Sequence, residues 1–210
     1  MTYTLYWSPA TASMAVHWML LELGIAHELA RVDLDGKQQK SEAYLALNPN
    51  GVVPTLIVDG VPRYESAALV MLLAERHPEG NLEPAPGTAA RADYLMWTVH
   101  LANTLQPAFR AWFYPDEPAG ADAADAAKTS ARVRIEAAWD RVDAHLADRT
   151  YMTGDSVSAL DFYATMLMRW SRNMPKPATT WPAIAAYVAR MKARPAFKVM
   201  YDREGLTEWA

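Results

Sequence analysis

Two adjacent residues near the middle of the first half of the chain suit the binding of an amino acid head group. Glu65 and Ser66 lie where a strand-like run gives way to a helical pattern. Free N–H groups at the start of a helix attract a carboxylate, Ser66 suits a helix cap, and the Glu65 side chain can hold an ammonium group. A ligand with an α-amino acid head would satisfy both residues. Taken singly, a plain helix cap and a charge at a helix end explain them more simply.

A second stretch, residues 48–54, reads NPNGVVP and stands directly before a β-branched run. Pro54 occupies the place where a strand begins, although proline has no N–H to donate and is confined to first or edge positions of strands. The proline also pushes Val53 toward extended geometry. If the bond between them is cis, the Val53 N–H and C=O point outward, free to pair with an extended ligand backbone. A simple turn is the alternative, because only about 5–6% of X–Pro bonds in folded proteins are cis.

The elements that must position these residues alternate between strand and helix in the first 80 residues. Hydrophobic alternation, turn residues such as Asp59-Gly60, and the glycine at position 24 mark their ends. The sequence predicts strands at 2–7, 27–34, 55–58 and 61–64, and helices at 14–23, 41–47 and 66–76.

A change of composition divides the chain after this region. Residues 78–87, PEGNLEPAPG, contain three prolines and two glycines, and no strand signal follows them. The remaining pattern predicts helices at 89–113, kinked at Pro107, and at 121–146, 159–170 and 181–193, with a break at 115–120 and a last turn near Phe197. We therefore expect an α/β domain at 1–78, a linker at 79–87 and an all-α domain at 88–210.

Composition excludes several kinds of chemistry. The 210 residues include no cysteine, so disulfides, thiolate metal sites and a cysteine nucleophile are excluded. The five histidines lack the HxxxH spacing of a helical zinc site, and we expect no metal. A net charge of −4 without a basic tract argues against nucleic acid or an anionic membrane as a partner. The N-terminus, MTYTLYWSPATAS, does not read as a signal peptide, and we expect a cytoplasmic protein.

Taken together, these features resemble the cytosolic glutathione S-transferase superfamily. The order of elements is similar over nearly the whole chain, and it implies a thioredoxin-like βαβ-αββα domain followed by an all-helical domain. NPNGVVP is similar to the family's cis-proline loop, whose residue before the proline pairs with the cysteinyl backbone of glutathione. RYESAAL is similar to its γ-glutamyl site. The resemblance implies a glutathione site formed by Val53, Pro54, Glu65 and Ser66, with Gln39 and Lys40 at the glycine carboxylate.

The resemblance also implies that residues 8–13 carry the group that faces the glutathione sulfur. Classes of the family use tyrosine, serine or cysteine there. Counting back from Gly24 places Ala10 at the usual serine position and Ala12 at the usual cysteine position, so the chain does not belong to a cysteine-type class.

Two hydroxyl residues at the start of the first helix can replace those groups. A free thiol has a pKa of about 8.5, and lowering it by ~2 units takes roughly 2.7 kcal/mol. A charge-assisted hydrogen bond together with a helix N-terminus can supply this stabilisation. We expect Ser13, and next Thr11, to be the catalytic hydroxyls; Tyr6, Ser8, backbone N–H groups, or a plain capping role for the two hydroxyls remain alternatives.

The second substrate that the resemblance implies is a small apolar electrophile. Within residues 100–114, Asn103, Gln106 and Arg110 are spaced three or four apart and share one helical face, and Trp112 and Tyr114 can wall an aromatic compound. Core packing is the alternative for the aromatic residues. We expect Asn103, Arg110, Trp112 and Tyr114 to line the electrophile pocket.

The function implied is that of a bacterial glutathione S-transferase, a homodimeric detoxification enzyme with glutathione as its cosubstrate. A glutathione-binding carrier or regulatory protein without transferase turnover is an alternative that Ala10 and Ala12 favour. A glutathione-dependent isomerase or dehalogenase on the same scaffold is another. Ser158 and Asp161 form a capping box in its aspartate form, similar to a folding motif of the family's helical domain.

Overall fold

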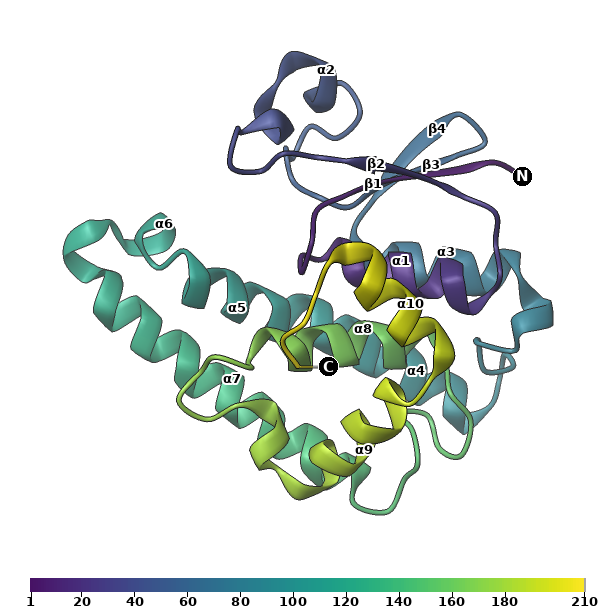
Figure 1. Ribbon diagram of the computed structural model, residues 1–210. Coiled ribbons are helices and arrows are strands. Elements are labelled where there is room, and N and C mark those ends of the chain that lie inside the picture. Colours follow the sequence, from purple (N-terminus) through teal and green to yellow (C-terminus); the bar gives the residue numbers. More distant parts are fainter. Residues whose placement is uncertain (210) are drawn as a thin grey trace. The chain divides into compact units, whose positions relative to one another are not determined.

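The computed structural model of the protein describes residues 1–209, apart from the side chain of Ala119 (Figure 1). Contacts divide the chain into two compact units. The first contains residues 1–83 together with the chain from 191 onward, and the second contains residues 84–190. The domain limits expected from the sequence, 1–78, 79–87 and 88–210, stay a prediction, although the contacts group the last residues with the first unit rather than with the second.

The first unit is built on a mixed sheet with the strand order β2-β1-β3-β4. Strand β1 pairs in parallel with β2 and antiparallel with β3, and β3 and β4 form a hairpin. The hairpin turn, Asp59-Gly60, has positive φ at both residues, 50° and 82°, as a two-residue I′ turn requires. The four expected strands are confirmed, and β2 is shorter than expected; the bounds are β1 (Tyr3–Trp7), β2 (Glu28–Arg31), β3 (Thr55–Val58) and β4 (Val61–Tyr64).

Helices of the first unit are α1 (Ser13–Glu22), α2 (Glu42–Leu45), α3 (Ser66–Arg76) and α10 (Pro195–Glu204). Most of α1 is buried, and it ends as expected at Gly24, whose φ of 64° and N–H bond to the Leu21 carbonyl belong to a Schellman motif. The last helix is longer than the single turn expected near Phe197. It lies beside α1 and contacts it (Figure 1). The ring centroids of Trp18 and Phe197 are 5.0 Å apart.

The second unit is helical. Its bounds are α4 (Ala89–His100), α5 (Gln106–Phe113), α6 (Asp116–Ala119), α7 (Ala124–Leu146), α8 (Ala159–Trp170) and α9 (Pro182–Lys192). The chain is helical over 89–113 as expected, and a π-type turn at Leu101–Leu105, just before Pro107, divides this stretch into α4 and α5. Pro107 is the physical reason: it has no N–H for the residue 103 carbonyl, and its ring crowds that carbonyl. The expected break at 115–120 contains the short helix α6.

The start of α8 is fixed by a buried carboxylate. Asp161 is completely buried and accepts hydrogen bonds from the Ser158 N–H at 2.7 Å, the Met152 N–H at 2.9 Å and the Tyr187 hydroxyl at 2.9 Å. Burial raises the pKa of Asp161, and these hydrogen bonds oppose that rise. The capping box expected at Ser158 and Asp161 is confirmed.

We predict that Asp161→Asn lowers the free energy of unfolding by about 2–4 kcal/mol, because the new NH₂ group would face donors and leave buried N–H groups unpaired. Urea denaturation followed by circular dichroism measures the change. Asp155→Asn, at an exposed position just before the helix, is the control and should shift the unfolding free energy by less than about 0.5 kcal/mol. Equal stability of the two variants would contradict the role given to Asp161.

Candidate functional site

The loop before β3 is held by a buried hydrogen-bond network. The Asn48 side chain is fully buried, and its Nδ2 donates to the Val52 carbonyl at 2.8 Å and to the Thr55 hydroxyl at 3.2 Å. The Tyr44 hydroxyl donates to the same Val52 carbonyl at 2.8 Å and lies 2.9 Å from the Thr55 hydroxyl. Burial raises the pKa of Tyr44. Sequence reasoning missed Tyr44, Asn48 and Thr55, since nothing local marks three polar groups that meet around one carbonyl.

Two backbone groups in this loop are left open. The Val53–Pro54 peptide bond is cis. Val53 is 8% exposed, and within residues 1–209 neither its N–H nor its C=O has a hydrogen-bond partner. Backbone polar groups at such depth nearly always have a partner. The N–H and C=O of Val53 are therefore a matched donor and acceptor for an extended ligand.

A short turn with two polar side chains lies against this loop. The turn Gln38–Lys40 contacts Gly51: a Cβ at Gly51, where φ is 59°, would lie 2.9 Å from the Gln39 carbonyl oxygen. The Lys40 ammonium donates to the Asn50 carbonyl at 3.4 Å. The structure thus brings Gln39 and Lys40 next to the loop that carries Val53, as one site would require.

The junction between β4 and α3 has an unusual backbone. Glu65 has φ 75° and ψ 105°, a conformation that is rare outside glycine, and its side chain is exposed. Such strain is typical of functional sites. The expectation that Ser66 caps the helix is wrong: Glu65 occupies the N-cap position, and the Ser66 hydroxyl donates to the Ala12 carbonyl at 2.9 Å. Ser66 therefore ties the start of α3 to the loop before α1.

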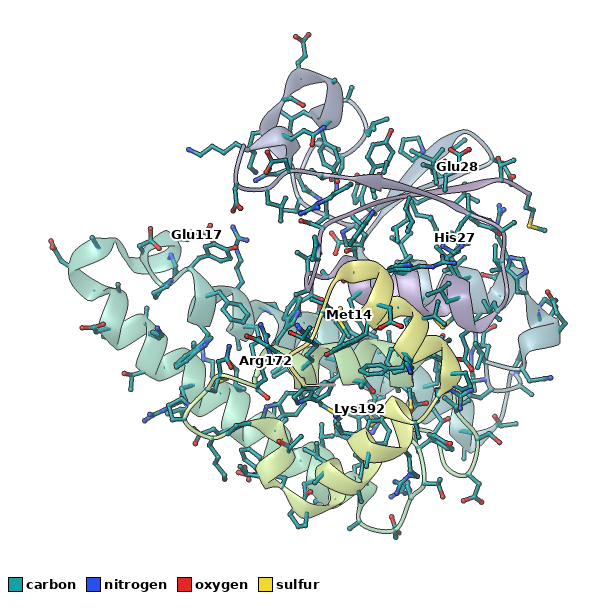
Figure 2. The ribbon with its side chains drawn as sticks, viewed as in Figure 1. Met14, His27, Glu28, Glu117, Arg172 and Lys192 are labelled. Carbon is teal, nitrogen blue, oxygen red and sulfur yellow. The ribbon has the colours of Figure 1, made fainter. Side chains whose placement is uncertain are left out.

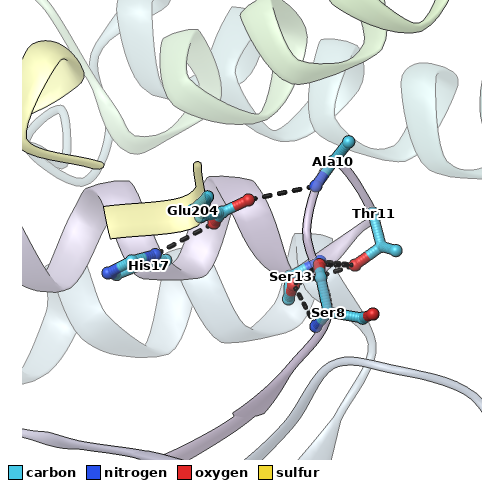
Figure 3. Close-up of polar contacts among 6 residues, drawn as sticks. All are labelled: Ser8, Ala10, Thr11, Ser13, His17 and Glu204. Carbon is cyan, nitrogen blue, oxygen red and sulfur yellow. Dashed lines mark hydrogen bonds and ion pairs between the residues drawn. The ribbon is translucent and has the colours of Figure 1, made fainter. Parts of the chain in front are cut away.

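That loop, residues 8–13, is closed by its own hydroxyl groups (Figure 3). Thr11 donates to the Ser8 carbonyl at 2.7 Å, and the Ser13 hydroxyl lies 3.1 Å from the same carbonyl and 2.9 Å from the Thr11 hydroxyl. Ser13 is completely buried, whereas Thr11 is partly exposed. The burial of Ser13 favours a structural role for its hydroxyl, and the catalytic role expected of both residues stays a prediction.

The residues expected to meet an electrophile belong to the second unit. Arg110 forms a two-pronged ion pair with Glu117, with its Nε 2.7 Å from Oε2, and its guanidinium lies 4.0 Å from the Tyr114 ring centroid (Glu117 is labelled in Figure 2). The Lys128 ammonium lies 4.7 Å from the Trp112 ring centroid. Asn103 is exposed in the π-type turn. The structure brings Arg110 and Tyr114 together, and the pocket expected from all four residues stays a prediction.

Two other kinds of site are not found in the described part of the chain. Residues 1–209 contain no group of three histidine or carboxylate side chains arranged to hold a metal ion. None of the described helices combines the length and the apolar character needed to cross a membrane.

The fold defines the class of protein. It consists of a thioredoxin-like domain followed by a helical domain. The models of the glutathione S-transferase N-terminal and C-terminal domains match residues 4–83 and 100–190. A glutathione S-transferase of Xanthomonas campestris pv. campestris is 30% identical, with 96% of this chain and 98% of that protein covered. The chain belongs to the glutathione S-transferase family.

Solved structures agree with this assignment. A sphingomonad glutathione S-transferase complexed with glutathione is 31% identical and superimposes with a TM-score of 0.83 over 97% of this chain and 100% of its own. A glutathione transferase homologue from Sulfitobacter with bound glutathione is 25% identical, with a TM-score of 0.90 over 98% and 99%. The expected fold class is confirmed.

We predict that Asn48→Ala lowers the free energy of unfolding by about 2–3 kcal/mol, because it removes a buried partner of the Val52 carbonyl and of the Asn50 N–H. Thermal or urea unfolding measures the loss. Asn50→Ala changes an exposed side chain in the same loop and is the control. The network would not hold the loop if the two variants unfolded alike.

Proposed function

We propose that the protein is a glutathione transferase that binds glutathione along its first unit and activates the glutathione sulfur. The observation that carries the proposal is the unpaired N–H and C=O of Val53, next to a carbonyl held by the hydrogen bonds of Tyr44, Asn48 and Thr55. An extended peptide ligand can pair with both groups as an added strand does. Glutathione contains such a peptide, and the family membership supports it as the cosubstrate.

The ends of glutathione match the groups on either side of Val53. Its γ-glutamyl ammonium would meet the exposed Glu65 carboxylate, and its γ-glutamyl carboxylate would meet the first N–H groups of α3, beginning at Ser66. Its glycine carboxylate would meet Gln39 and Lys40. The contacts of Gly51 with the Gln39 backbone and the Lys40 side chain support this arrangement, since they set this turn beside the Val53 loop.

The sulfur would lie at the start of α1. The N–H groups of Thr11 and Ala12 have no hydrogen-bond partner among the described residues, and Thr11 is partly exposed. These two N–H groups and the helix N-terminus favour a thiolate, and the Thr11 hydroxyl would join them by turning its hydrogen from the Ser8 carbonyl to the sulfur. The thiolate would then attack the electrophilic carbon of an apolar compound, for which Asn103, Arg110, Trp112 and Tyr114 remain the proposed contacts.

A homodimer and a cytoplasmic role in detoxification are part of the proposal. Three exposed apolar side chains of α4 support the dimer, because Leu95, Met96 and Val99 are 41%, 55% and 56% exposed and gather on one part of the helix.

A carrier without turnover is the second candidate. Two observations favour it: alanine occupies both positions where the family's serine or cysteine is expected, and the Ser13 hydroxyl is buried. A carrier would keep the Val53 and Glu65 contacts and would leave the pKa of the bound thiol unchanged.

We predict that Glu65→Ala weakens glutathione binding by about 10- to 100-fold, because it removes a charge-assisted hydrogen bond to the ligand ammonium. Isothermal titration calorimetry measures the affinity. Glu75→Ala removes an exposed carboxylate from the other end of the same helix and should leave the affinity within about twofold. An unchanged affinity in Glu65→Ala would place the γ-glutamyl group elsewhere.

We predict that the thiolate absorbance of bound glutathione titrates about 2 pH units below the free value of ~8.5. Ultraviolet titration with protein in excess measures it, and a pKa at the free value would establish the carrier instead.

Thr11→Val should raise the pKa of the bound thiol and lower kcat more than it changes KM. Ser13→Ala is the matched comparison, because its buried hydroxyl should act on stability rather than on the titration.

A further inference from the structure

A carboxylate from the last helix reaches the loop that is proposed to hold the sulfur. Glu204, at the end of α10, is 5% exposed. Its Oε2 accepts the Ala10 N–H at 3.1 Å, and its Oε1 lies 2.9 Å from His17 Nδ1 on α1 (Figure 3). A buried carboxylate is tolerated only when donors satisfy it. The loop and α1 each supply one donor.

The bond to Ala10 is made by a residue with an uncommon backbone conformation. Ala10 has a φ of 60°, in the left-handed region that disfavours residues with a Cβ. The hydroxyl groups of Thr11 and Ser13 bind the Ser8 carbonyl, and Glu204 binds Ala10. Because the Ala10 N–H is directed at Glu204, the N–H groups that follow it in the loop are left for the sulfur.

His17 holds the carboxylate in this position. Its side chain is completely buried, and its Nε2 has no hydrogen-bond partner among the described residues. A hydrogen on Nδ1 would donate to the Glu204 carboxylate, which can only accept. The neighbouring His27 ring lies 5.9 Å away between centroids, and burial lowers the pKa of His27.

A second tie between α10 and α1 lies away from the loop. Arg194, just before α10, forms an ion pair with Glu22 at the end of α1, with its Nε 3.1 Å from Oε1. Both ties join the same two helices, yet only Glu204 contacts residues 8–13. Glu204 and Glu22 are therefore a test residue and a matched control for an experiment.

We infer that Glu204 is a positioning residue for the sulfur site: from the C-terminal helix it fixes the Ala10 backbone, and so aims the Thr11 and Ala12 N–H groups at the glutathione thiolate. The inference rests on the proposed transferase function. Glu204 itself does not contact the ligand. Helix α10, near the end of the chain, therefore helps to position a site formed by residues near its start.

The test compares Glu204→Gln with Glu22→Gln in the full chain. An amide at 204 can accept only one of the two hydrogen bonds well, because its NH₂ group faces a donor. In Glu204→Gln we expect Ala10 amide exchange, followed by nuclear magnetic resonance without ligand, to be about tenfold faster. With ligand, we expect the bound thiol pKa to rise by about one unit and kcat/KM with chlorodinitrobenzene to fall about tenfold, while glutathione affinity changes less than threefold. Glu22→Gln should change none of the four.

Two results would overturn the inference. The first is that Glu204→Gln has the same Ala10 exchange rate and the same bound thiol pKa as the wild type. The second is that Glu22→Gln shifts both quantities as much as Glu204→Gln does, which would reveal a general loosening of α10. If Glu204→Gln does not fold, Glu204→Asp replaces it, since a side chain shorter by one methylene cannot span Ala10 and His17. Failure of the proposed function is seen separately, as wild-type protein that does not bind glutathione. The ligand-free exchange at Ala10 still shows whether Glu204 holds the loop.

Discussion

The carbonyl of Val52 is the point on which the first unit's site depends. It accepts hydrogen bonds from both Tyr44 and Asn48, and the Thr55 hydroxyl joins the same two side chains. A carbonyl that accepts two hydrogen bonds cannot rotate without losing both partners. The next residue, Val53, therefore keeps its unpaired N–H and C=O in a fixed direction. The hydrogen bonds to the Val52 carbonyl thus orient the Val53 N–H and C=O, which are the groups proposed to contact the ligand.

Hydrogen bonds also fix the backbone of the loop before α1, some from within the loop and some from other elements. Hydroxyl groups inside the loop satisfy the Ser8 carbonyl, and Ser66 and Glu204 satisfy backbone groups of Ala12 and Ala10 from other elements. Three parts of the chain, the starts of α1 and α3 and the end of α10, converge on six residues. Because their partners are far apart in sequence, the loop takes its shape only when the whole unit is folded.

Local signals explain which elements could be predicted. Strand β3, the Asp59-Gly60 turn, β4 and α3 have the expected bounds, since turn residues and periodicity mark both ends of each. Family motifs are also local, and they indicated Val53 and Glu65, whose contacts with glutathione stay a prediction. The sequence predicts only a kink at Pro107, because a proline does not determine whether the turn before it becomes π-helical. Glu204 could not be found, since its partners lie 187 and 194 residues away.

A carboxylate close to a loop that stabilises a thiolate raises an electrostatic difficulty, because like charges oppose ionisation of the thiol. Magnitudes show how the chain can tolerate it. Lowering the thiol pKa by ~2 units takes roughly 2.7 kcal/mol, whereas a helix N-terminus contributes about 0.3–1 kcal/mol at an exposed site. The helix alone is too weak, so well-directed hydrogen bonds worth about 1.5–3 kcal/mol each must supply the rest. The direction of those bonds is what Glu204 sets, and its own charge is already engaged by two donors. In a chain without a cysteine, and with alanine at the usual serine position, the proposed thiolate would depend more on the direction of backbone N–H groups than on any single side chain.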